Sequence, residues 1–225
     1  GQAWPTLRLA VSTASSLREE VARAFHARFG VPLRQGFGII EVGLPILNDS
    51  PLEKPLSVGC PDEFQVRLVR EDGSVCAVEE TGELQLKGPG FFDAYLKPWK
   101  TREEVMKDGW FSTGDLASQD SDGFVFIRGR RKSVINFGGM KFFPEEVEEV
   151  LAMHPQVAEC RVIGEPHEQW NQIPVAEVVS VDAVSKPTAV ALSKHCRSLM
   201  ASYKVPVRFR FVREIAKTAS GKIKR

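Results

Sequence analysis

Four short stretches of this 225-residue chain contain side chains that could bind or activate a ligand. The first is Gln35-Gly36-Phe37-Gly38, followed by Glu41. The glycines would let a flat ligand approach the backbone, Phe37 could stack on it, and Glu41 could hold a hard cation such as Mg²⁺. Taken alone, this stretch fits a turn after a strand with a solvated glutamate better than it fits a site.

The second stretch runs from Trp110 to Asp115. A carboxylate that follows a glycine turn, here Gly114, can accept hydrogen bonds from both hydroxyls of a ribose. An aspartate that caps a turn gives the same pattern. The stretch by itself does not choose between these two interpretations.

The third stretch combines Arg128–Lys132 with Asn136–Lys141, and five of its side chains are cationic. Clustered cations attract phosphates, although a solvated basic loop looks similar. The pair Gly138-Gly139 favours a functional interpretation, because it leaves room for a ligand close to the backbone.

The fourth stretch is Lys217–Lys222. A lysine on a small turn, such as Lys222, can neutralise negative charge in a transition state. Without further context, a frayed basic tail explains the stretch better.

Several functional classes are excluded or disfavoured by composition. The 30 Lys and Arg residues against 29 Asp and Glu residues give a net charge of +1, which disfavours a nucleic-acid binder. No apolar run approaches the roughly 20 residues of a membrane span. The chain has neither a GxxxxGK[ST] phosphate loop nor a GxSxG hydrolase signature, and its scattered His and Cys residues have no metal-binding spacing.

The expected elements divide the chain into three parts. Residues 1–50 predict strand, helix and strand, with the helix ending at Gly30, so we interpret them as a fragment of a larger α/β domain that packs on further protein. Residues 51–131 contain short alternating strands, an Asp72-Gly73 hairpin signal and a helix capped by Thr101, which indicate a small antiparallel barrel or sandwich. Of these two we predict the barrel.

Residues 132–225 predict a compact α+β domain, and the fold class of the whole chain is α+β. Pro144 suits the first turn of a helix, and a second helix is expected over 187–201. Strands are expected over 157–163, 175–181 and 207–212.

In order and spacing, the four stretches resemble the C-terminal part of the adenylate-forming enzyme superfamily. This superfamily includes acyl-CoA synthetases, adenylation domains of peptide synthetases and firefly luciferase. The stretches Gly82–Pro89 and Pro144–Glu148 fit the resemblance too, which runs through the whole chain.

The wide spacing of Cys60, Cys76, Cys160 and Cys196, with no CxxC pair, favours reduced thiols in a cytoplasmic protein over disulfides. The resemblance implies a ligase that uses ATP and Mg²⁺ to convert a small carboxylic acid into its acyl-adenylate. The acyl group then passes to coenzyme A or, as an alternative, to an acyl-carrier protein. Neither the acid nor the oligomeric state follows from the sequence.

The resemblance also implies roles for individual residues. Phe37, between Gly36 and Gly38, would stack on adenine, and Glu41 would act in catalysis through Mg²⁺. Asp115 would bind the ribose, and Arg130 the ribose or a phosphate.

In the third and fourth stretches, Lys132 would be the hinge about which a mobile C-terminal domain rotates. Gly138 and Gly139 would line the tunnel for the pantetheine thiol of coenzyme A. Lys222 would support adenylation.

The chain departs from the family pattern in three places. Ile40 replaces a threonine whose hydroxyl would serve the adenylate phosphate, and losing such a donor costs on the order of 2–4 kcal/mol. Ser12–Ser16 replaces a Ser-Gly-Gly-Ala-Pro stretch. The Ser/Thr/Gly-rich phosphate loop is absent, so we expect this chain alone to be inactive; a non-catalytic module derived from such an enzyme is the alternative.

Overall fold

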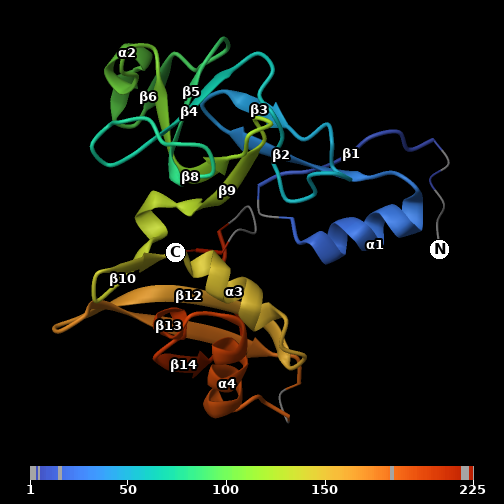
Figure 1. Ribbon diagram of the computed structural model, residues 1–225, viewed down its shortest axis with the longest axis vertical. Coiled ribbons are helices and arrows are strands. Elements are labelled where there is room, and N and C mark those ends of the chain that lie inside the picture. Colours follow the sequence, from blue (N-terminus) through green and yellow to red (C-terminus); the bar gives the residue numbers. More distant parts are fainter. Residues whose placement is uncertain (1–3, 5, 15–16, 183–184, 219–222, 225) are drawn as a thin grey trace. The chain divides into compact units, whose positions relative to one another are not determined.

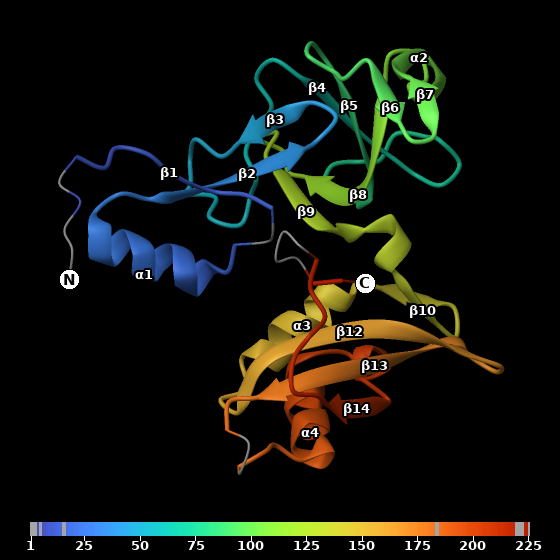
Figure 2. The same cartoon turned by 180° about the vertical axis from the view of Figure 1, so that it is seen from behind.

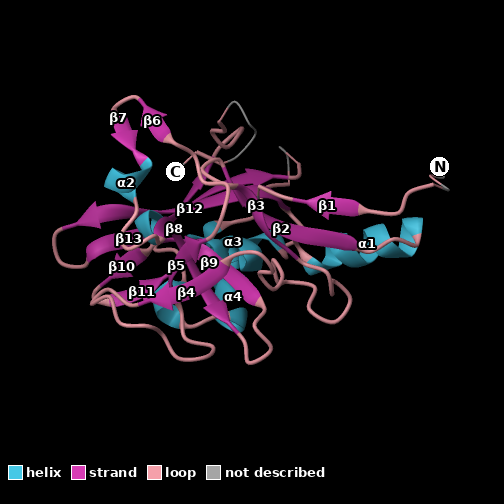
Figure 3. Ribbon diagram, turned by 90° about the horizontal axis from the view of Figure 1, so that it is seen from above, coloured by secondary structure: helices cyan, strands magenta, loops and turns pink. Residues whose placement is uncertain are grey.

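The computed structural model describes residues 4, 6–14, 17–182, 185–218 and 223–224. The chain forms two compact units, Gly1–Arg128 and Gly129–Arg225, which are described separately below. Both contain mainly β-structure with a few helices, as Figure 1 and Figure 3 show, so the predicted α+β class is confirmed. In the part of the chain that the structure describes, no helix is long and apolar enough to cross a membrane.

A three-stranded sheet and one helix open the first unit, in the predicted order of strand, helix and strand. The helix ends at Gly30, whose φ of +70° places it in the left-handed region, as predicted. The second strand is longer than predicted, since it continues through Gly36 and Gly38. The elements are β1 (Ala10–Ser12), α1 (Glu19–Phe29), β2 (Leu33–Ile39) and β3 (Gly43–Leu47).

The strand β1 pairs with β2 in parallel, and β2 pairs with β3 in antiparallel orientation. None of the α1 residues, Glu19–Phe29, is buried. The expectation that this segment packs against further protein stays a prediction.

A four-stranded sheet in the order β4-β5-β8-β9 forms the middle of the chain. The edge strands β4 and β9 do not pair with each other, so the sheet is open and the predicted barrel is not confirmed. A short hairpin, β6-β7, leads into the helix α2. The elements are β4 (Gln65–Val69), β5 (Gly82–Lys87), β6 (Ala94–Leu96), β7 (Trp99–Thr101), α2 (Arg102–Val105), β8 (Phe111–Gln119) and β9 (Val125–Arg130).

Of two local predictions in this segment, the helix cap at Thr101 is confirmed and the strand expected after Gly73 is not. The backbone N–H of Thr101 donates to the Glu104 carboxylate at 2.7 Å, which confirms the predicted helix cap. The chain turns at Gly73, but the strand expected after it is reduced to one isolated bridge between Val69 and Val75. The strand β4 pairs instead with β5, further along the chain.

One hydrophobic core holds the first unit together. It contains Phe37 from β2 and Ile46 from β3 together with Leu84, Leu86 and Phe111 from the four-stranded sheet. The β2-β3 hairpin and the four-stranded sheet are therefore packed as one body.

The second unit is built on a five-stranded sheet in the order β11-β10-β13-β12, with β14 also paired to β13. Figure 2 shows its long β12-β13 hairpin from behind. The predicted strands and helices are all present with shifted ends, and Pro144 occupies the first turn of α3, as expected. The elements are β10 (Ile135–Phe137), β11 (Met140–Phe142), α3 (Pro144–Ala152), β12 (Val157–His167), β13 (Asn171–Ser180), α4 (Ala189–Leu199) and β14 (Arg208–Phe211).

The core of the second unit lies between this sheet and its two helices. Val147 and Leu151 of α3 and Leu192 and Cys196 of α4 are each fully buried there. Burial raises the pKa of the Cys196 thiol to about 11, so this thiol is a protonated part of the core.

Candidate functional site

Glu41 lies in the tight turn that joins β2 to β3, and two contacts hold it there. The hydroxyl of Tyr95 donates to Glu41 Oε1 at 2.6 Å. The backbone N–H of Phe92 donates to the backbone carbonyl of Glu41 at 2.8 Å. Burial of the phenol and its bond to Glu41 raise the pKa of Tyr95 to about 12, so Tyr95 is a neutral donor at physiological pH.

Glu41 offers a single carboxylate to a metal ion. Among the described residues, no group of three or more His, Cys, Asp and Glu side chains could hold a metal ion. A Glu41 that offers one carboxylate fits Mg²⁺, which commonly binds through one or two carboxylates together with substrate phosphates and waters. It does not fit a cage built by the protein alone.

The residues before Glu41 pack more closely than the sequence suggests. Phe37 is only 8 % exposed, so a stacking partner would meet a small part of its ring. A Cβ on Gly36 would lie 2.9 Å from Leu44 Cδ1, the end of a flexible side chain that can move aside, so a small side chain could be accommodated there. Ile40 is 94 % exposed at the tip of the turn. The proposed contact of Phe37 with adenine stays a prediction.

Asp115 lies in an irregular part of β8. Ser112 pairs with Gln85 and Leu116 with Glu83, so the strand bulges over residues 113–115. The backbone N–H of Asp115 donates to the Thr113 hydroxyl at 3.1 Å, and Asp115 is only 4 % exposed. Gly114 has a φ of +74°, which agrees with the predicted glycine turn. Bulges of this kind re-aim side chains and occur often beside active sites.

The cationic cluster begins at the boundary of the two units. Arg128 binds the Ser118 hydroxyl through its Nε and Nη2 atoms at 3.0 and 2.8 Å. Arg130 ends β9, and Lys132 lies in the short 3₁₀ turn Arg131–Ser133 that follows. Both Arg130 and Lys132 are exposed.

Gly138 and Gly139 form the two-residue turn of the β10-β11 hairpin. Their φ values are +58° and +91°, as the hairpin geometry requires, and Gly139 N donates to Asn136 Oδ1 at 2.9 Å. A Cβ on Gly139 would meet no atom within 4 Å, whereas one on Gly138 would lie 2.8 Å from Trp170. Room for a ligand therefore exists at Gly139.

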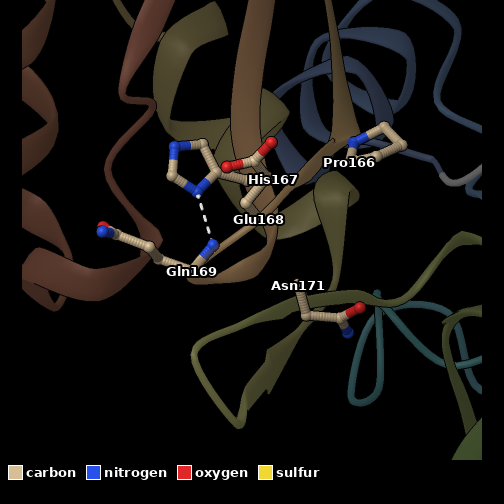
Figure 4. A pocket seen from close by; sticks show the side chains of 5 residues that line it. All are labelled: Pro166, His167, Glu168, Gln169 and Asn171. Atoms are coloured by element: carbon tan, nitrogen blue, oxygen red, sulfur yellow. Dashed lines mark hydrogen bonds between the residues drawn. The ribbon is translucent and has the colours of Figure 1, made fainter.

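A shallow hollow lies at the end of the β12-β13 hairpin and contains none of the predicted residues. Figure 4 shows its lining, in which the Gln169 backbone N–H donates to His167 Nδ1 at 3.3 Å. This bond occupies one nitrogen of the imidazole. The lining residues are Pro166, His167, Glu168, Gln169 and Asn171.

The predicted residues are divided between the two units. Glu41, Phe37 and Asp115 belong to the first unit, and Arg130, Lys132 and the glycine pair belong to the second. Lys222 lies outside the described residues. Sequence reasoning missed Tyr95 and Trp170, because nothing local in the sequence indicates that their partners are Glu41 and Gly138.

Comparison with known proteins assigns the family. Residues 2–96 match the AMP-binding enzyme family, and residues 146–222 match the AMP-binding enzyme C-terminal domain. The chain therefore belongs to the adenylate-forming enzymes, as the sequence motifs predicted.

The relatives that it matches are ligases. Sulfoacetate–CoA ligase of Cupriavidus necator is 36 % identical over 229 residues, which cover 100 % of this chain and 45 % of that protein. The o-succinylbenzoate CoA synthetase of Bacillus subtilis, solved with its acyl-adenylate intermediate, superimposes with a TM-score of 0.87 at 30 % identity, covering 98 % of this chain and 46 % of that one.

The same Bacillus subtilis enzyme solved with ATP and a magnesium ion gives a TM-score of 0.84 at 29 % identity, again over 98 % of this chain and 46 % of that one. The chain thus spans less than half of the length of these relatives. Because these similar proteins are ligases, the chain is related in general terms to ligases.

Proposed function

We propose that the chain is the C-terminal part of an ATP-dependent acid–thiol ligase that makes an acyl-adenylate and transfers the acyl group to coenzyme A. One observation carries the proposal: the chain matches both parts of the family and has Glu41, Asp115, Arg130 and Lys222 in the order of the family motifs. The whole protein is then a cytoplasmic enzyme whose partners are a small carboxylic acid and coenzyme A.

In this proposal, the first unit serves the nucleotide. Asp115 accepts hydrogen bonds from the ribose, and Phe37 with Gly36 and Gly38 lies beside the adenine. Glu41 would hold Mg²⁺, which neutralises phosphate charge when it is bound. Its half-buried, hydrogen-bonded carboxylate supports this assignment, because it is oriented before a ligand arrives.

The second unit serves both half-reactions. Lys222 places a cation on the acid or phosphate during adenylation, and Arg130 assists at the ribose or phosphate. Lys132 acts as a hinge between the half-reactions. The hairpin turn at Gly138 and Gly139 then admits the pantetheine arm, a role supported by the open space at Gly139.

The decisive experiment separates the two half-reactions in the full-length ligase. Lys222→Ala should lower acid-dependent pyrophosphate release by roughly 10²- to 10³-fold, because the transition state loses a charge-stabilising donor. Thioester formation from supplied acyl-adenylate should stay intact. Lys224→Ala is the matched control and should leave both steps unchanged.

Equal loss of both half-reactions in Lys222→Ala would contradict the assigned role. The acceptor is tested by offering coenzyme A and holo acyl-carrier protein separately. Acylation of the carrier protein alone would overturn the proposal of coenzyme A.

Ile40 favours one other candidate, a non-catalytic module derived from such an enzyme. Its exposed alkyl side chain stands where the family pattern has a hydroxyl donor. A full-length protein that binds ATP but releases no pyrophosphate with any acid would support this module.

A further inference from the structure

We propose that Tyr95 is a positioning residue for Glu41: its phenol binds one carboxylate oxygen and thereby directs the other oxygen toward the metal ion. This inference rests on the proposed function, since it assumes that Glu41 acts through Mg²⁺. It adds a residue that lies outside the motifs discussed so far.

The hydrogen bond itself is short and links distant parts of the chain. The Tyr95 hydroxyl donates to Glu41 Oε1 at 2.6 Å, a length typical of a bond to an ionised carboxylate. Tyr95 belongs to β6, and Glu41 to the β2-β3 turn, 54 positions earlier. The bond is therefore a product of tertiary structure.

A second contact from the same segment fixes the backbone of Glu41. The backbone N–H of Phe92 donates to the carbonyl oxygen of Glu41 at 2.8 Å. The Phe92 ring lies 4.5 Å from the Tyr95 ring and 6.2 Å from that of Phe111, which belongs to the core. Residues 92–95 thus anchor both the backbone and the side chain of Glu41 to a rigid body.

The chemistry of the pair suits a metal carboxylate. A carboxylate has about four acceptor positions, and a phenol occupies only one of them. Burial and the bond to Glu41 raise the pKa of Tyr95, so the phenol donates without ionising. Partners of this kind orient metal-binding side chains in many proteins, and their loss costs roughly 10- to 100-fold in metal affinity or activity.

The first test is Tyr95→Phe in the full-length ligase, which removes the hydroxyl and keeps the ring that packs on Phe92. We expect the Mg²⁺ concentration for half-maximal pyrophosphate release to rise roughly 10- to 100-fold, with most of the rate recovered at saturating Mg²⁺. Tyr203→Phe removes the other tyrosine hydroxyl of this 225-residue chain and should leave the Mg²⁺ dependence unchanged. An unchanged Mg²⁺ dependence in Tyr95→Phe, or a lower rate that Mg²⁺ does not restore, would overturn the inference.

The second test needs no activity. In the 225-residue chain carrying Tyr203→Phe, Tyr95 is the single tyrosine, and its ionisation is followed by tyrosinate absorbance. Its pKa of about 12 should decrease when Glu41→Gln removes the negative acceptor, although burial still keeps it raised, while circular dichroism verifies the fold. An identical midpoint in both proteins would show that the bond does not form.

The two proposals fail in different ways. A Glu41→Gln ligase with full adenylation would remove the catalytic role of Glu41 and, with it, this part of the proposed function. A Tyr95→Phe ligase with normal Mg²⁺ dependence beside an inactive Glu41→Gln ligase would overturn only the role of Tyr95.

Discussion

Gly138 lies against the indole of Trp170, which comes from the far end of the β12-β13 hairpin. The Gly138 N–H donates to the Trp170 carbonyl oxygen at 2.9 Å, and a Cβ on Gly138 would approach indole Cε3 to 2.8 Å. The neighbouring Gly139 has no such contact. Gly138 is therefore constrained by its contact with Trp170 as well as by its backbone conformation. Gly139 is constrained by its backbone conformation alone.

Gly138→Ala should destabilise the protein by roughly 1–3 kcal/mol. The new methyl group meets the Trp170 ring, and a φ of +58° costs alanine about 1–2 kcal/mol by itself. Urea unfolding gives the free energy of unfolding. The control is the same substitution in a Trp170→Ala background, where the loss should be smaller because the ring is gone. An equal loss in both backgrounds would contradict the packing argument.

Gly139→Leu should impair the thioester-forming step of the full-length ligase by at least about tenfold and leave pyrophosphate release nearly unchanged, because a side chain there would fill the proposed thiol path. Each half-reaction is measured separately. Gly90→Leu is the matched control, since Gly90 also has a positive φ and open space around its Cβ position. Similar losses in both variants would show that backbone strain, rather than a blocked path, is responsible.

The second unit should lose stability in mild acid through His154. Burial, assisted by the nearby His195 with ring centroids 5.2 Å apart, lowers the pKa of His154 below 6.5. The folded protein thus binds this proton less readily than the unfolded chain. The stabilisation is present above pH 6.5 and is lost as the pH falls through the lowered pKa.

Thermal unfolding measured between about pH 7 and pH 5 tests this expectation. His154→Asn should show a smaller decrease in melting temperature than the unmodified chain, because asparagine does not take up a proton in this pH range. Its amide oxygen can still accept the Gln156 N–H that His154 Nδ1 accepts at 3.3 Å, so the local structure is kept. His167→Asn is the control: it has the same type of bond, to Gln169, but is exposed. If His154→Asn loses as much as the unmodified chain, His154 is not responsible.

Local sequence signals predicted the elements well. The turn at Gly30, the cap at Thr101 and the start of α3 at Pro144 depend on residues a few positions apart, and all three are present. The barrel was not confirmed and the strand after Gly73 was wrong, because strand pairing is decided by partners far along the chain.

In the candidate site, too, local sequence indicated the residues but not the contacts that hold them. Motif order indicated Glu41 and Asp115, but the contacts that hold Glu41 come from Phe92 and Tyr95, more than fifty positions later. The burial of Phe37 also depends on strands that no local pattern associates with it. Sequence therefore indicated which residue types matter, and tertiary packing determines how they are oriented.

One edge of β13 pairs with two different strands, β10 and β14. Because β14 comes later in the sequence, part of this edge has no partner while the chain is being synthesised. The strand β10 pairs only at Asn171, and β14 pairs with the stretch Val175–Val178, where Val175, Ala176 and Val178 are fully buried. During translation, that apolar stretch leaves the ribosome well before β14 does. Until residues 208–211 emerge, it presents an open edge to which another nascent chain could pair. The edge of β13 is therefore completed only after residues 181–207 have been synthesised.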